Sequence, residues 1–441
     1  MSSKKIVIER TFTAEDKEKY IFIPFDVPEN CEKIKISFVT DKTEGICIDL
    51  GLVYPDGTQN GASGGRTKEI EISAKYSTDG YEPTEPYAGV WQIIAGVYRP
   101  KSGVTATYTI EFMFKEKRWL KGDTHTHTSH SDGNLKTEKL IAYALKKKLD
   151  YIIITDHNNT RAASHNFTNP NLTIIKGMEL TEFKGHCNIW GLEKPFDEPY
   201  IANTFEEFVA LAQKAKDNGG LISVNHPFCK LCGWHWPLDD FQFDAAEVWN
   251  GPMRIDNITT LNWWHDKLLK GERLPAVGGS DFHRDFGNIT RLLACPTTVV
   301  YASSNSPSDI LGSLKNANSV ITSRPKGPML YLECEGKTVG EEVTFHENIM
   351  LNVRGERLKK GQLLEIFNND EIIYSEKIKS PTISFTIPVR SKGFIRAQTS
   401  YQYGKAATFL YRQVVKFMIP EDAKLPLPRF MSCITNPIWF I

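Results

Sequence analysis

Residues 151–157 read Tyr151-Ile152-Ile153-Ile154-Thr155-Asp156-His157, an apolar run that ends in a polar pair. Such a run is typical of a buried parallel strand that carries polar side chains at its carboxyl end. Four further apolar runs between residues 119 and 325 also end in a histidine or a carboxylate, and amphipathic helical stretches alternate with them. This alternation predicts an α/β fold, either a barrel or a doubly wound sheet.

Three domains are expected, because 441 residues is about three times the usual domain length of roughly 150. In residues 1–117, apolar and polar residues alternate in short segments that are separated by turn residues. This pattern predicts an N-terminal β-sandwich. Residues 118–326 carry the α/β pattern. The alternation of apolar and polar residues returns in residues 327–441 and predicts a C-terminal β-sandwich. The tail of this segment is apolar, so we expect it to pack back on the protein.

Helix signals punctuate the middle segment. We expect one helix over 137–148 and another that opens with a capping box at Thr204 and Glu207. A third is expected to have Pro307 at its first helical position. The run Lys146-Lys147-Lys148 then falls at a helix C-terminus, where the helix dipole favours cations, so it needs no nucleic-acid partner.

The overall charge excludes a general attraction to polyanions. Lys plus Arg and Asp plus Glu each number 53, so the chain is formally neutral and neither nucleic acid nor anionic lipid is an expected partner. We find no apolar run near 18 residues and no apolar stretch typical of a secretory signal, so we expect a cytoplasmic protein without a membrane span. The eight scattered cysteines, including the Cys229 and Cys232 pair, are interpreted as reduced thiols.

The polar residues at the strand ends form a set with the chemistry of a metal centre. His125 and His127 are two residues apart, so in an extended strand both point to one side. The carboxyl ends of barrel strands converge on one face, where these side chains would meet. Nine nitrogen and oxygen donors suit two or three divalent ions with a bridging carboxylate, and imidazole with carboxylate favours Zn, Mn or Fe. The predicted ligands are His125, His127, Asp132, His157, Glu179, His186, His226, Asp281 and His283.

Isolated histidines are more often surface or packing residues than ligands. That interpretation applies to His130, His165, His265 and His346, and His265 has helical spacing with neighbouring leucines. It does not fit the set of nine, since unpaired buried polar groups are destabilising and serve no structural purpose behind strand ends.

The ordered motifs of this set resemble the polymerase and histidinol phosphatase (PHP) superfamily of metallohydrolases. They are His-x-His with Ser-Asp-Gly (residues 125–133), Thr-Asp-His (155–157), the isolated Glu179, Asn-His-Pro (225–227) and Gly-Ser-Asp-x-His (279–283). The flanking β segments and the terminal Asn-Pro-Ile resemble its carbaryl-hydrolase-like (CehA/McbA) branch.

The resemblance implies a distorted, TIM-like (β/α)7 barrel with up to three metals. It implies a first metal bound by His125, His127, Glu179 and Asp281. It implies that Glu179 bridges to a second held by His186 and His226, and that Asp132, His157 and His283 hold a third.

These ligands favour a multinuclear, metal-dependent hydrolase. A water that bridges two divalent ions loses a proton near neutral pH, and the hydroxide can attack phosphorus or a carbonyl carbon. We expect Asp281, Glu179 and His226 to be the catalytic residues, with Asp281 or a nearby histidine passing a proton to the leaving group. Our first hypothesis is a phosphoesterase acting on small mono- or diesters, including nucleotides. The alternatives are a carbamate, ester or amide hydrolase, and a binding module with a vestigial barrel.

Substrate contacts are predicted next to these ligands. Lys184, Arg284 and His235 could contact a phosphate or another anion, Arg284 through a bidentate fork. Trp234 and Trp236 could wall the pocket with apolar surface. Each of the three polar residues also fits a solvated surface position.

Overall fold

The computed structural model describes residues 2–41, 47–65, 69–98, 103–161, 167–192, 199–284, 292–418, 420 and 422–441. The chain divides into two compact units. The first comprises Met1–Arg118 with Thr168–Thr173 and Ser303–Asp309, and the second comprises Trp119–Phe167, Ile174–Ala302 and Ile310–Ile441.

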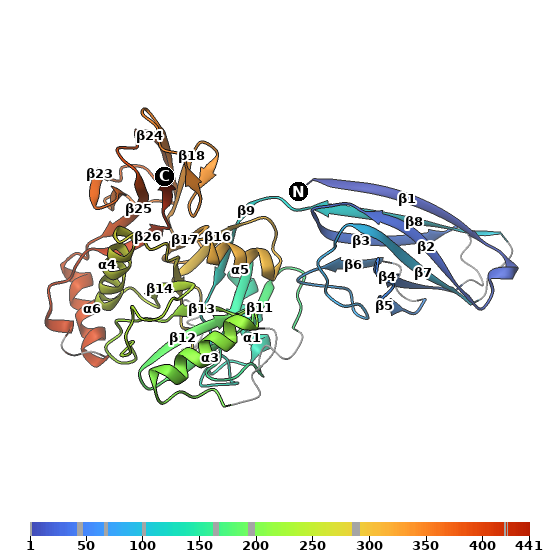
Figure 1. Ribbon diagram of the computed structural model, residues 1–441, viewed down its shortest axis with the longest axis horizontal. Helices are drawn as coiled ribbons and strands as arrows, with labels where there is room; N and C mark the ends of the chain where they lie inside the picture. The colour runs from blue at the N-terminus through green and yellow to red at the C-terminus, as the bar shows by residue number, and fades with distance from the viewer. Residues whose placement is uncertain are drawn as a thin grey trace. The chain divides into compact units, whose positions relative to one another are not determined.

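The first unit consists of two four-stranded antiparallel sheets (Figure 1). One has the order β1 (Ser3–Phe12), β8 (Val104–Phe114), β3 (Cys31–Thr40) and β6 (Glu69–Ser73), and the other has β2 (Lys19–Val27), β7 (Gly89–Val97), β4 (Ile48–Val53) and β5 (Gln59–Ser63). A short 3-10 turn, η1, spans Ala14–Asp16. Alternate residues of β8 are buried, as the period of a half-buried strand requires. Ile36 and Ile110 of one sheet share a core with Leu50 and Ile93 of the other.

A large mixed sheet organises the second unit. Its order is β15-β14-β13-β12-β11-β10-β9-β16-β17-β26-β25-β22-β23. The strands nearest the predicted ligands are β9 (Arg118–Asp123), β10 (Tyr151–Ile154), β11 (Thr173–Glu182), β12 (Gly185–Trp190), β13 (Leu221–Val224), β14 (Ala245–Asn250), β15 (Ala276–Gly279), β16 (Thr297–Ala302) and β17 (Ser319–Thr322). Strand β10 is buried along its whole length, as its unbroken apolar run predicts.

This sheet curls back on itself. Past the strand ends, Thr126 and Phe282 form a parallel bridge, so the chain leaving β9 lies beside the chain leaving β15. The backbone N–H of Asp281 donates to the carbonyl of His125 at 2.9 Å in the same place. Gly278 of β15 also exchanges hydrogen bonds with the Thr298 hydroxyl of β16, at 2.9 and 2.7 Å. The polar ends of β9 and β15 are therefore held together by backbone contacts.

Five helices are defined in the described residues: α1 (Thr137–Lys146), α3 (Phe205–Asp217), α4 (Ile255–Leu269), α5 (Pro307–Lys315) and α6 (Lys405–Met418). The first two expected helices have their counterparts in α1 and α3, although α1 ends at Lys146 rather than at residue 148. At the start of α3, the Thr204 hydroxyl accepts a hydrogen bond from the backbone of Glu207 at 3.2 Å. Pro307 is the first residue of α5.

The mixed α/β character predicted for the middle segment is confirmed, but the alternation of strand and helix is broken. Strands β11 and β12 pair antiparallel and are joined by a turn at Phe183 and Lys184. Strand β13 then pairs antiparallel with β12. An antiparallel pair needs only a short turn, whereas a parallel pair needs a crossover, so no helix separates Glu179 from His186.

The C-terminal segment contributes to two sheets. Strands β19 (Lys337–Thr338), β18 (Met329–Cys334), β21 (Met350–Glu356) and β24 (Ile383–Pro388) form a separate sheet. The large sheet is extended by β22 (Leu363–Asn368), β23 (Glu371–Lys377), β25 (Gly393–Tyr401) and β26 (Phe430–Thr435), and β20 (Glu342–Val343) pairs with β27 (Ile438–Phe440) off this path; η2 spans Asp422–Lys424. In the tail, the Asn436 amide exchanges two 2.8 Å hydrogen bonds with the backbone of Ala276.

Among the described residues, no helix has the length and apolarity needed to cross a bilayer.

Candidate metal centre

Six of the nine predicted ligands lie just beyond the ends of strands of the large sheet. His125 and His127 follow β9, His157 follows β10, His226 follows β13, and Asp281 and His283 follow β15. Glu179 and His186 lie within β11 and β12, and Asp132 lies in the loop after His127. Because the sheet curls, side chains that are up to 156 positions apart in the sequence face one another.

The first group surrounds a fully buried pair of imidazoles. The Nε2 atom of His125 lies 3.5 Å from Glu179 Oε1 and 3.3 Å from Asp281 Oδ1. The Nε2 atom of His127 lies 3.5 Å from Glu179 Oε2 and 3.1 Å from Asp281 Oδ1. These contacts bring together the four residues predicted for the first metal.

Several of these facing atoms are buried and have no hydrogen-bond partner within the described residues. They are Nε2 of His125, both ring nitrogens of His127, Oε2 of Glu179 and Oδ1 of Asp281. Orphaned buried polar atoms are rare and destabilising, and four of these, His125 Nε2, His127 Nε2, Glu179 Oε2 and Asp281 Oδ1, belong to side chains that face one another. A divalent cation between these side chains would satisfy the four atoms, so the donor set fits a metal site.

The second group shares Glu179. Its Oε1 atom lies 3.2 Å from His186 Nδ1 and 3.5 Å from His226 Nε2. The Asn225 amide donates to the same oxygen at 2.8 Å, which fixes the carboxylate. Glu179, His186 and His226 each offer a ligand atom within 4.8 Å of the others, as the prediction for a second metal requires.

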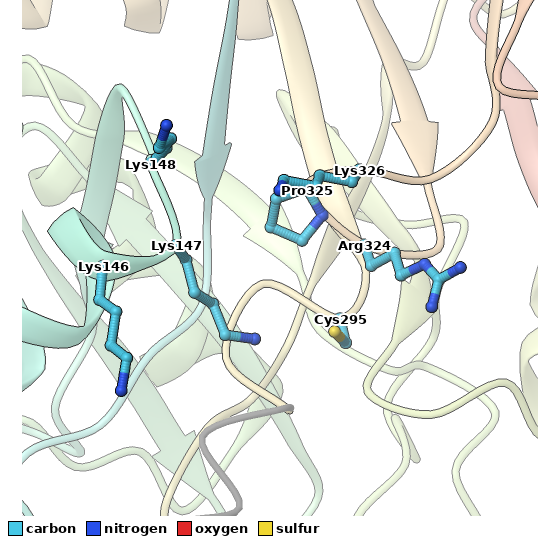
Figure 2. A pocket seen from close by; sticks show the side chains of 7 residues that line it. All are labelled: Lys146, Lys147, Lys148, Cys295, Arg324, Pro325 and Lys326. Atoms are coloured by element: carbon cyan, nitrogen blue, oxygen red, sulfur yellow. The ribbon is translucent and has the colours of Figure 1, made fainter.

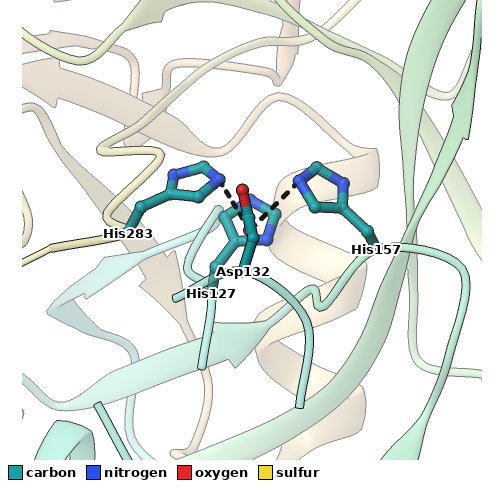
Figure 3. Close-up of side chains that lie close together, drawn as sticks. All are labelled: His127, Asp132, His157 and His283. Atoms are coloured by element: carbon teal, nitrogen blue, oxygen red, sulfur yellow. Dashed lines mark ion pairs between the residues drawn. The ribbon is translucent and has the colours of Figure 1, made fainter. Parts of the chain in front are cut away.

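Figure 3 shows the third group, in which His157 and His283 both point toward Asp132. This group is more open to solvent than the other two. The Nε2 atoms of His157 and His283 lie 3.4 and 3.2 Å from Asp132 Oδ1, and the Asp132 side chain is 59% exposed. The His127 ring stacks on the His283 ring with centroids 4.0 Å apart, and these four residues meet the same 4.8 Å criterion. The geometry thus adds His127 to the predicted trio.

The electrostatics of the centre favour cations. Burial raises the pKa of Glu179, but the imidazoles of His125, His157 and His186 hold it well below its usual range. Burial lowers the pKa of His226, and the Glu179 carboxylate outweighs this effect and raises the pKa to about 9. Protons on the imidazoles compensate the buried carboxylates when no metal does, so metal binding would release protons.

Glu247 supports this centre and was not among the predicted residues. Its Oε1 atom lies 3.0 Å from His125 Nδ1, and Oε2 accepts from the backbone of His226 at 3.1 Å. A carboxylate at Nδ1 makes that nitrogen the donor and leaves Nε2 with a lone pair toward Glu179 and Asp281. The only sign of this role in the sequence is that Glu247 is a single carboxylate inside the otherwise uncharged strand β14.

Two buried aspartates hold the loops of the centre. Asp156 accepts hydrogen bonds from the Thr128 backbone, the Thr128 hydroxyl and the Ser131 hydroxyl at 2.6–2.7 Å, which positions the loop carrying Asp132. Asp123 accepts from the backbone of Ser280 at 2.9 Å and of Ala294 at 2.6 Å.

Two predicted ligands have backbone conformations that side chains rarely adopt. His226 has φ of 31° and Asp281 has φ of 51°. Each follows directly after a strand, where a tight change of direction turns the side chain into the centre. Such strain persists only where surrounding structure holds it, and it is common at functional sites.

The three predicted substrate contacts are all exposed. The His235 backbone donates to the Lys184 carbonyl at 2.6 Å, so these two residues lie in adjoining loops. Trp234 and Trp236 are buried. They pack in the core with Phe208, and their rings lie 5.0 and 5.2 Å from the Phe208 ring.

The remaining histidines and the cysteine pair lie as follows. His265 and His346 contact Arg396 and Glu335, away from the centre, and His165 is outside the described residues. Cys232 Sγ lies 3.2 Å from Cys229 Sγ and 3.6 Å from His226 Nδ1. The cysteine loop therefore packs against a predicted ligand, which the sequence interpretation did not anticipate.

Comparison with known proteins identifies the same segment. The PHP domain family matches residues 123–229, less than half of the chain, and this stretch contains the predicted ligands from His125 to His226. The chain is similar to a two-domain protein from Bacteroides vulgatus containing a predicted PHP-like metal-dependent phosphoesterase, with 20% identity, a TM-score of 0.41, and coverage of 64% of this chain and 90% of that one. It is also similar to a candidate metal-dependent phosphoesterase from Bifidobacterium adolescentis, with 17% identity, a TM-score of 0.27, and coverage of 40% and 95%. No curated protein matches the sequence.

Proposed function

We propose that this protein is a metal-dependent hydrolase that acts on phosphate mono- or diesters. The observation that carries the proposal is the convergence of nine donor side chains into three groups linked through Glu179 and His127. The PHP match at residues 123–229 supports the same class. Divalent cations bound there would supply Lewis acidity toward a phosphoryl oxygen and would lower the pKa of water.

The chain's own residues have distinct parts in this proposal. Glu179 and His127 would be shared between groups, and Glu247 would hold the His125 ring in one tautomer. The Asp281 side chain is 24% exposed, so it can reach both the buried imidazoles and a bound substrate. Asp281 and His226 would therefore exchange a proton with the leaving group, and Lys184, Arg284 and His235 would contact its anionic part.

We extend the proposal to the finer features of the fold and the cofactors. The curled sheet would be a distorted (β/α)7 barrel over residues 118–326, flanked by β-sandwiches over 1–117 and 327–441, as in the carbaryl-hydrolase-like branch. The centre would hold two or three ions of Zn, Mn or Fe, since its donors are imidazoles and carboxylates.

Carbonyl chemistry has less support. The carbamate, ester or amide alternative relied in part on an apolar wall at Trp234 and Trp236, and both side chains pack in the core instead. Phosphoester hydrolysis therefore remains the first proposal.

A substrate panel tests the choice. Protein loaded with Mn or Zn should hydrolyse phosphate mono- or diesters, including nucleotides, in preference to aryl carbamates and carboxylic esters. His125→Ala and Asp281→Ala should each abolish turnover while circular dichroism shows a retained fold. Activity on carbamates or esters alone would refute the phosphoesterase proposal, and full activity in both variants would refute the assigned roles.

A further inference from the structure

A second concave site lies at the other end of β10 from the metal centre. It is a cavity of about 590 Å³ lined by Lys146, Lys147, Lys148, Cys295, Arg324, Pro325 and Lys326 (Figure 2). Lys148 precedes β10 and His157 follows it, so the length of the strand separates the cavity from the third ligand group. The cavity belongs entirely to the second unit.

Within the part of the chain that the structure describes, the lining carries five cationic side chains and no carboxylate. Lys146, Lys148, Arg324 and Lys326 are exposed. None of these four has an ion pair with a carboxylate of the described residues. The dipole of α1 favours cations at its own C-terminus, but it does not account for Arg324 and Lys326, which follow β17 some 180 positions later. Like charges that gather in one concavity repel one another unless an anion joins them.

Lys147 lines the cavity and has N–H donors available for a ligand. Its ammonium donates to the Leu293 carbonyl at 2.6 Å and points toward Cys295 (Figure 2). An ammonium group has three N–H donors, so two remain for a ligand. Burial lowers the pKa of Lys147, and the nearby Cys295 and Asp123 oppose this effect only in part.

We propose that this cavity binds a multiply charged phosphate chain, such as a short polyphosphate. Arg324 offers a planar fork that matches phosphate oxygens, and the lysines offer compact charges around it. Several cations in one cavity favour a ligand with several charges over a single orthophosphate. Among the described residues, no aromatic side chain lines the cavity, so these residues offer no stacking platform for a nucleobase or for single-stranded nucleic acid.

The proposal goes beyond the proposed hydrolase function and does not depend on it. Its test is therefore made on full-length protein freed of divalent cations with a chelator and dialysed. Under that condition the probe cannot act by sequestering metal from the centre.

Inorganic tripolyphosphate is titrated into this protein in a calorimeter. We expect saturable binding that weakens as ionic strength rises. The variant Arg324→Glu/Lys326→Glu should bind at least about tenfold more weakly, because two contacts become repulsive. The matched control Lys139→Glu/Lys337→Glu carries the same change of net charge at exposed positions outside the cavity, and should bind as the unmodified protein does. All four positions are exposed, and thermal melts followed by circular dichroism verify the folds.

Three outcomes would overturn the proposal. One is no binding of tripolyphosphate, and another is equal weakening in the reversal and control variants. The third is binding of orthophosphate or of an oligothymidine as tight as that of tripolyphosphate with the same dependence on Arg324 and Lys326, which would assign the cavity to another ligand. None of these results bears on hydrolysis at the metal centre.

Discussion

Glu179 is the residue on which the candidate metal centre depends. Its Oε1 atom faces His125, His186 and His226, and its Oε2 atom faces His127 and His157. Five imidazoles around one buried carboxylate have no packing purpose. The proposed bridging of divalent ions by this carboxylate would account for both the number of rings and the two-sided use of the oxygens.

Replacing Glu247 should weaken metal binding without removing a predicted ligand. In Glu247→Ala, His125 loses the partner of its Nδ1 atom, so the ring loses its fixed tautomer and orientation. We expect metal affinity to fall about 10–100-fold, measured by metal titration and elemental analysis. Glu247→Gln keeps a hydrogen-bond acceptor for His125 Nδ1, so its metal affinity should fall less. Glu138→Gln, on the exposed face of α1, should leave the metal affinity unchanged. Equal affinity in Glu247→Ala and the unmodified protein would contradict this role.

The sequence predicted which side chains converge, but not the residues that support them. His157 and His226 directly follow short apolar runs, and parallel strands bring such ends together, so their convergence could be expected. Glu247 lies inside a strand, and its partner His125 is 122 positions away, so local spacing carried no sign of the contact. Supporting contacts depend on three-dimensional pairing that one sequence does not display.

At the scale of elements, the β11–β12 hairpin places His186 beside Glu179. The alternation of apolar runs and helical stretches in the sequence predicted strands separated by helices. The ten-residue strand β11 instead continues through a short turn into β12. Helix α6 was also missed, because residues 405–418 fall within a segment whose remaining pattern is alternating. A segment with one repeating apolar pattern can be predicted from the sequence. A local reversal of strand direction depends on the tertiary packing that surrounds the turn.

The hairpin turn rests on Gly185. A Cβ atom there would lie 2.4 Å from the Trp234 ring, which is fixed in the core. We expect Gly185→Ala to destabilise the protein by about 1–3 kcal/mol, as overpacking does, and to lower metal content by displacing His186. Melting curves and elemental analysis check both effects. The control Gly312→Ala in α5 meets no atom within 4 Å and should be neutral or slightly stabilising. Unchanged metal content in a destabilised Gly185→Ala would show that the turn does not position His186.

The packing of α4 on β25 should make stability depend on pH. His265 Nδ1 accepts a hydrogen bond from the buried Arg396 guanidinium at 3.0 Å. Burial, followed by the Arg396 charge, lowers the pKa of His265 to about 4. The unfolded chain, with a histidine pKa near 6.5, then binds the extra proton between these values. Stability is therefore fully present above about pH 6.5 and is lost as pH falls toward 4, by up to about 3 kcal/mol.

Urea unfolding at pH 7 and pH 5 measures this dependence. The stability of His265→Gln should fall less between these pH values than that of the unmodified protein, because the variant has no group to titrate. His346→Gln serves as the control, since His346 is exposed and its pKa is raised by Glu335, the opposite direction. An identical pH response in His265→Gln and the unmodified protein would contradict the assignment.

At the scale of the whole molecule, the division into two units predicts that metal removal acts on one of them. All nine predicted ligands belong to the second unit, and the first has its own buried core. A ligand that binds only the folded state at about 100 times its dissociation constant stabilises that state by about 2.7 kcal/mol. Calorimetry should therefore show two transitions, of which a chelator lowers only one, by roughly 5 °C. Leu50→Ala, in the core of the first unit, should lower only the other transition and so identifies it. A chelator that shifts both transitions equally would mean that the units unfold as one, and a chelator that shifts neither would mean that the nine side chains hold no metal.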